Sequence, residues 1–209
     1  AGFKAEYGVE PRQLDENDPC WISYRARTLT KFMHEVREAM DEVGRKRGRR
    51  VEVSAIVMST EEENLSAAMN LRAWVNEGLV DTIIPYSSGP NLDSMTPTWT
   101  NPGDLDFFIS ITRDTPVKLA PNIMPRQMSP EDYRKRASGL YGAGIENLFF
   151  WDSASQQRAH YSDSWSAMRR LGHIDEISEW RTSGELPLET PRMSLRKLGD
   201  WDLSYETPG

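Results

Sequence analysis

Four short apolar runs, each leading into a polar loop, recur along the chain with helical patterns between and after them. The runs are Val51–Val57, Val80–Pro85, Val117–Pro121 and Asn147–Trp151. Strands that alternate with helices form right-handed crossovers, and the resulting parallel sheet must be covered on both faces. The sequence therefore predicts an α/β fold built from about four strand–helix units.

Eight such units close a (β/α)₈ barrel, and four make half of one. The chain opens on Ala1, and Phe3–Gly8 has the pattern of the last turn of a helix. We therefore expect residues 1–181 to form the C-terminal half of a TIM barrel that belongs to a longer chain. From Thr182 onward, prolines and scattered apolar residues predict an extended linker, or the start of an appended β segment, over residues 182–209.

A long helix is predicted before the first apolar run. Asp18 and Pro19 have the residue types of an N-cap and a first helical position. Apolar residues then recur at alternating spacings of four and three, and Gly44 is expected to end the helix. These apolar residues are Ile22, Ala26, Leu29, Met33, Val36, Met40 and Val43. Other helices are expected over 61–76, over 102–113, from Ser129 to Gly142 or Gly144, and over 174–180.

Composition and charge narrow the classes of partner. The net charge of −7 argues against a nucleic-acid partner, because phosphate neutralisation needs a basic surface. No apolar run approaches the roughly 20 residues of a membrane span, so a soluble protein is expected. Cys20 is the single cysteine and cannot form an internal disulfide. That fits a reducing compartment, but many secreted enzymes also lack disulfides, so cytoplasmic and secreted locations both stay open.

Candidate ligand-binding residues follow from the rule that ligands sit at the carboxyl ends of barrel strands. Asp152 is the only carboxylate placed directly after an apolar run. It could act as acid, base, nucleophile or sugar-hydroxyl acceptor, or it could be an ordinary turn residue. Tyr86 and Trp151 could stack on a sugar ring or cap the core. Further substrate contacts are expected from Ser54, Trp99, Asn122 and Arg126.

Two strand acids are assigned to stability rather than to chemistry. Asp81 and Glu52 lie where strands begin, which is the opposite edge from the ligand-binding one. We expect both to pair with neighbouring cations such as Arg49 or Arg50.

Neither a metal nor a cofactor is expected from this sequence. The three histidines, His34, His160 and His173, lack metal-ligand spacing with one another or with acids. Gly142 and Gly144 follow a predicted helix instead of opening one, which indicates a helix C-cap and not a phosphate-binding loop.

Four segments have a recognisable pattern, and they are Tyr7–Pro11, Trp21–Ala26, Trp74–Pro85 and Gly144–Asp152. They resemble segments of bacterial glycosyl hydrolases of the family-ten-like group, and the resemblance covers about residues 1–180. It implies a TIM barrel that hydrolyses O-glycosidic bonds of a poly- or oligosaccharide. The acids expected after the fourth strand of such enzymes would precede Ala1. Asn122 stands where many barrel glycosidases carry a glutamate.

Two other hypotheses remain open beside carboxylate-dependent hydrolysis. The chain could be a non-catalytic carbohydrate-binding or scaffold barrel, or it could carry a different barrel chemistry such as metal-dependent hydrolysis. If the segment exists alone, its exposed sheet edges predict self-association.

Overall fold

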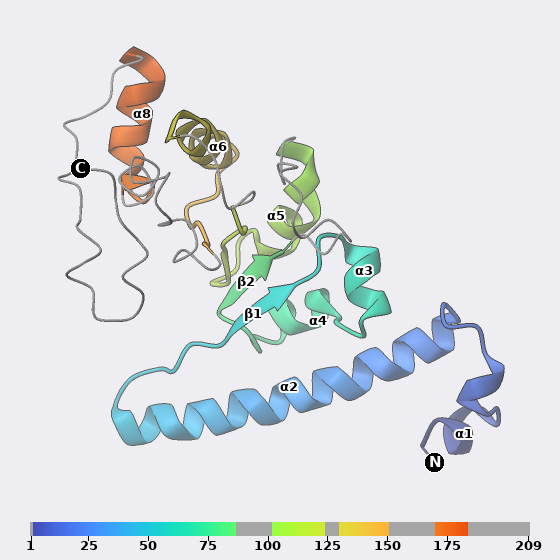
Figure 1. Cartoon of the computed structure of the whole chain (residues 1–209). Helices are drawn as coiled ribbons and strands as arrows, with labels where there is room; N and C mark the ends of the chain where they lie inside the picture. Colours follow the sequence, from blue (N-terminus) through green and yellow to red (C-terminus); the bar gives the residue numbers. More distant parts are fainter. Residues whose placement is uncertain (1, 87–101, 124–129, 151–169, 184–209) are drawn as a thin grey trace, which may run out of the picture. The chain divides into compact units, whose positions relative to one another are not determined.

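The computed structural model describes residues 2–86, 102–123, 130–150 and 170–183, and Figure 1 shows their helices and strands. The chain divides into two compact units. Unit 1 comprises Ala1–Ser88 and Phe107–Leu119, and unit 2 comprises Gly89–Asp106 and Ala120–Gly209. The predicted domain boundary at residue 181 stays a prediction, and residues 184–209 lie outside the described part.

The long helix α2 spans Pro19–Arg47, and it begins where the sequence predicts. The Asp18 carboxylate caps it by accepting hydrogen bonds from the backbone N–H groups of Cys20 and Trp21. The predicted end at Gly44 is wrong, because the helix continues to Gly48, whose φ of 67° makes the left-handed C-cap. Gly44 is buried inside the helix, where an added Cβ would lie 2.9 Å from the Arg49 carbonyl oxygen.

An aromatic cluster holds the N-terminal segment against the start of α2. Helix α1 spans Gly2–Tyr7 and is followed by the 3-10 turn η1 over Pro11–Gln13. Phe3 is buried, stacks on Tyr7 with 4.6 Å between ring centroids, and meets Trp21 edge-on at 5.2 Å. Such ring pairs contribute about 0.5–1.5 kcal/mol each beyond their buried area. Tyr7 also meets Tyr24 edge-on at 6.4 Å, so two of the segments that carry the resemblance pack on each other.

The sheet of unit 1 has three short parallel strands in the order β1-β2-β3. Strand β1 spans Ser54–Val57, β2 spans Thr82–Pro85 and β3 spans Lys118–Leu119. The register pairs Ser54 with Thr82, Val57 with Pro85, and Thr82 with Lys118. Strand β2 is central, and its Ile83 is completely buried.

Short helices connect the strands of unit 1. Helices α3, Glu61–Ser66, and α4, Leu71–Asn76, replace the single helix predicted over 61–76. The break has a local cause: Ala68 adopts a φ of 64°, and the side chain of Asn70 caps α4. After the 3-10 turn η2, Pro102–Leu105, helix α5 spans Asp106–Thr112 and buries Phe108.

Unit 2 contains two packed helices, α6 over Pro130–Gly142 and α8 over Ile174–Ser183. The Tyr141 hydroxyl donates a hydrogen bond to the carbonyl of Leu171, whose side chain is fully buried. Helix α6 ends near the predicted glycines, and Gly144 has a φ of 84° in the turn that follows.

The expectation of half a TIM barrel is wrong. In the described residues helices outweigh strands, and the sheet has three strands. The fourth predicted run contributes one parallel bridge, between Phe149 and Asn122, in unit 2. The prolines that bound the third run, Pro116 and Pro121, lack a donor N–H and restrict β3 to two residues.

Strand β1 is an edge strand of the sheet. In the part of the chain that the structure describes, β1 pairs with β2 on one edge and with no strand on its other edge, and its residue Ile56 is 45% exposed. Self-association through this edge stays a prediction.

Candidate functional site

The structure describes three of the seven predicted site residues. Ser54 and Tyr86 belong to unit 1, and Asn122 belongs to unit 2. The other four, which are Trp99, Arg126, Trp151 and Asp152, lie outside the described residues.

Tyr86 lies at the carboxyl edge of the sheet, where ligands bind in open parallel sheets. Val57 and Pro85 end their strands in register, and the Tyr86 backbone N–H donates to the Val57 carbonyl at 2.9 Å. This bond fixes the backbone of Tyr86 directly after a buried strand end, while its side chain is half-buried. Ser54, by contrast, is the first residue of β1, so its predicted contact with substrate stays a prediction.

Asn64 organises the loop that follows β1 at the same edge. Its Oδ1 accepts from the Met58 N–H at 3.0 Å, and its Nδ2 donates to the carbonyls of Met58, at 3.1 Å, and Thr60, at 2.6 Å. The residue is 1% exposed. Asn64 also begins an Asn-Leu-Ser glycosylation triplet, but its burial excludes a glycan on the folded chain.

Two acids after this loop, Glu61 and Glu63, are engaged in local structure. Glu63 and Thr60 form a capping box at the start of α3, and the Ser59 hydroxyl donates to Glu63 Oε2 at 2.6 Å. The Ser59 hydrogen bond, with help from backbone N–H groups and against the effect of burial, holds the pKa of Glu63 below its usual value. Glu61 forms a bidentate pair with Arg72 at 2.6 and 3.0 Å. These two carboxylates act as ionised acceptors.

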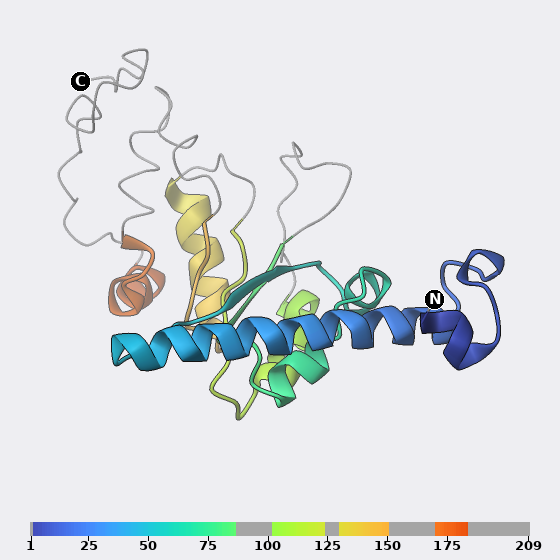
Figure 2. The same cartoon turned by 90° about the horizontal axis from the view of Figure 1, so that it is seen from below.

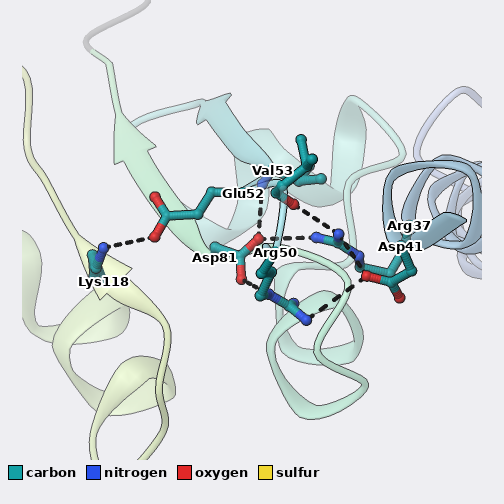
Figure 3. A network of polar contacts seen from close by, with 8 residues as sticks. Arg37, Asp41, Arg50, Glu52, Val53, Asp81 and Lys118 are labelled. Atoms are coloured by element: carbon teal, nitrogen blue, oxygen red, sulfur yellow. Dashed lines mark hydrogen bonds and ion pairs between the residues drawn. The ribbon is translucent and has the colours of Figure 1, made fainter. Parts of the chain in front are cut away.

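The amino edge of the sheet carries a partly buried charge network centred on Asp81 (Figure 3). Its carboxylate accepts from Arg37 Nη1 at 2.9 Å, from Arg50 Nε at 2.7 Å and from the Val53 N–H at 2.7 Å. Arg37 is 6% exposed and also donates to the Val51 carbonyl. The prediction that Asp81 is structural and pairs with Arg50 is confirmed.

Burial alone would raise the pKa of Asp81. The Val53 hydrogen bond and the ion pairs with Arg50 and Arg37 outweigh burial, so the pKa lies below its usual value. Glu52 is also structural, but the predicted arginine partner is wrong: it pairs with Lys118 on β3 at 3.0 Å.

A groove of about 1090 Å³ separates α2 from α3 and α4 within unit 1. His34 Nε2 and Glu77 Oε2 lie 2.6 Å apart at this groove, and Trp74 Nε1 donates to Thr30 Oγ1 at 3.2 Å. Apolar and polar side chains share its lining, as in many ligand pockets. Sequence reasoning missed this groove, because its paired residues are 43 and 44 positions apart and have no local signal.

Within the described ranges, no group of three or more His, Cys, Asp and Glu side chains is placed to hold a metal ion. None of the described helices combines the length and apolar character that a membrane crossing requires. Comparison with protein-family models gives no match, and comparison with curated proteins gives none either.

Proposed function

We propose that this chain is a carbohydrate-active protein that binds a poly- or oligosaccharide and takes part in hydrolysing its O-glycosidic bonds. The placement of Tyr86 carries the proposal. A half-buried aromatic ring beside a strand end is the kind of side chain that stacks on a sugar ring. The resemblance of the sequence to glycosyl hydrolases supports the same substrate class.

We assign the catalytic carboxylate to Asp152. The strand and loop acids Asp81, Glu52, Glu61 and Glu63 are held in ion pairs or a helix cap. Asp152 follows the last predicted strand run in the sequence. Glycoside hydrolysis ordinarily uses two carboxylates, one of which acts as acid and the other as base or nucleophile. The assignment to Asp152 covers one of these two roles.

The role of Tyr86 predicts a loss of saccharide binding when its ring is removed. We expect Tyr86→Ala to weaken binding by about fivefold or more, because ring stacking is worth about 1 kcal/mol beyond its area. Isothermal titration of the full chain with a panel of α- and β-linked gluco-, xylo- and manno-oligosaccharides measures the effect.

Tyr86→Phe is the matched control, since it keeps the ring and removes only the hydroxyl. We expect it to retain most of the affinity and both variants to unfold at a temperature close to that of the parent. Equal affinities for Tyr86→Ala and the parent protein would remove Tyr86 from the binding site.

A further inference from the structure

Helix α2 ends in a run of cations. Residues 45–50 comprise five arginines and lysines and one glycine, and they include no acid. Two of the five cations are engaged within the chain, because Lys46 pairs with Glu42 and Arg50 pairs with Asp81. The other three are exposed, and no ion pair or hydrogen bond of their side chains is present among the residues that the structure describes. These three residues, Arg45, Arg47 and Arg49, form the arginine cluster.

The turn that ends α2 holds the arginine cluster together. The Gly48 N–H donates to the Arg45 carbonyl, and the Arg49 N–H returns to the Gly44 carbonyl at 3.1 Å, so Arg49 lies against the last turn of the helix. An added Cβ at Gly44 would lie 2.9 Å from the Arg49 carbonyl oxygen, which leaves this segment little room to move away. Figures 1 and 2 show this end of α2 away from α3 and α4. The three charges therefore share one exposed corner of unit 1.

The helix end offsets only a small part of this charge. The carbonyl end of a helix is equivalent to roughly half a negative charge, whereas the arginine cluster carries three positive charges that repel one another. Several exposed cations elsewhere in unit 1 are paired with carboxylates, and these are Lys4, Arg27, Arg72 and Lys118. The arginine cluster thus exceeds what the helix end requires, and an anion from outside the chain would stabilise it.

We propose that the arginine cluster binds the carboxylate or sulfate groups of an acidic polysaccharide. This inference rests on the proposed function and names the chemical class of the saccharide. A guanidinium is charged at every physiological pH, and its planar fork of N–H donors fits the oxygens of an oxyanion in a bidentate contact. The cluster lies before β1 at the amino edge of the sheet, whereas Tyr86 lies at the carboxyl edge. It is therefore a second contact for a long polymer and no part of the Tyr86 site.

The charge of the whole chain favours an acidic polysaccharide over a nucleic acid. The chain has a net charge of −7, so most of its surface repels a polyanion within a Debye length of about 10 Å. A DNA duplex carries about one negative charge per 1.7 Å of its axis and would meet this repulsion along its whole length. A polyuronate carries one carboxylate on each sugar, so its charges are more widely spaced and a small cluster can bind a few of them.

Titration calorimetry of the full chain with paired charged and uncharged polymers tests the inference. Polygalacturonate is compared with its methyl ester, which keeps the sugars and removes the charge, and dextran sulfate is compared with dextran. We expect at least one charged polymer to bind about tenfold or more tightly than its uncharged counterpart. This preference should weaken as salt rises from about 0.05 to about 0.5 M, because the Debye length shortens. The polymer that is preferred identifies carboxylate or sulfate as the group bound.

A triple variant, Arg45→Gln with Arg47→Gln and Arg49→Gln, links the preference to the arginine cluster. We expect it to bind the preferred charged polymer at least about tenfold more weakly and the uncharged polymers unchanged, because three exposed charge contacts are lost together. The control variant replaces three other exposed cations of unit 1 by glutamine and changes the net charge equally; these are Arg12, Lys31 and Arg113. It should keep the preference. Circular dichroism verifies that both variants are folded.

The outcomes separate this inference from the proposed function. Equal losses in the two triple variants, or no loss in the cluster variant, would overturn the inference. Binding of uncharged saccharides without any preference for charged ones would overturn it and leave the proposed function standing. Tighter binding of duplex DNA than of either charged polymer at the same salt would also overturn it and assign the cluster to nucleic acid. If no saccharide of either kind binds, the proposed function fails as well.

Discussion

Replacement of Asp81 by asparagine is expected to lower the free energy of unfolding by about 3–5 kcal/mol. The variant keeps the shape of the side chain but removes the charge that Arg37 and Arg50 share. Arg37 would then remain 6% exposed, without its less exposed counter-charge and with Asp41, which is 40% exposed, as its ion-pair partner. Urea unfolding at neutral pH, followed by circular dichroism, measures the difference.

Glu52→Gln is the matched control, because it removes a carboxylate from the same edge of the sheet. Glu52 and Lys118 are each about half exposed, so their ion pair should contribute less than about 1 kcal/mol. If Asp81→Asn cost no more than Glu52→Gln, the network around Asp81 would not be what joins α2 to the sheet.

The pH dependence of this effect has a definite sign. The pKa of folded Asp81 lies below its ordinary value of 3.8, so the carboxylate stabilises the fold at pH values above the unfolded pKa. The stabilisation is lost as the pH falls through the folded pKa. The difference in unfolding free energy between the parent protein and Asp81→Asn should therefore be constant near neutrality and shrink below about pH 4.

Replacement of Asn64 by alanine is expected to destabilise the protein by about 2–3 kcal/mol. The side chain satisfies both backbone groups of Met58 and the carbonyl of Thr60 at a site that is 1% exposed. Alanine would leave both backbone groups of Met58 without their side-chain partner, whereas the Thr60 carbonyl keeps the backbone N–H of residue 64 at 3.1 Å, and the change would open a small cavity. Urea unfolding again measures the loss.

The exposed Asn76, at the end of α4, offers a matched control for the loss of an amide. We expect Asn76→Ala to change stability by no more than about 0.5 kcal/mol. Equal effects at Asn64 and Asn76 would contradict the view that Asn64 builds the loop at the carboxyl edge.

Local chemistry was sufficient to predict where the long helix begins. Asp18 and Pro19 mark the start of α2 because capping and a fixed φ act within one turn. The strands were predicted too long, because side chains take up backbone groups that would otherwise form strand-to-strand hydrogen bonds. The Val51 carbonyl bonds Arg37 and the Val53 N–H bonds Asp81, so β1 begins only at Ser54.

Pairing over long distances could not be read from the sequence. The half-barrel expectation assumed that four apolar runs pair as four strands, but Phe149 makes only one bridge with Asn122. The position of Asp81 at a strand beginning predicted its structural role, whereas no local pattern predicted that Arg37, 44 positions away, would meet it. No local pattern predicted the contact of His34 with Glu77 at the groove either, because these residues are 43 positions apart.

Hydrolysis of the oligosaccharide panel by the full chain, with and without Asp152→Asn, tests the proposed function most directly. New reducing ends report turnover, and titration calorimetry reports binding. We expect the parent protein to cleave at least one member and Asp152→Asn to lower kcat by about 10²–10⁴ while binding changes only slightly. Binding without cleavage by the parent protein would indicate a non-catalytic carbohydrate-binding protein. The absence of both binding and cleavage would contradict the assignment to carbohydrates.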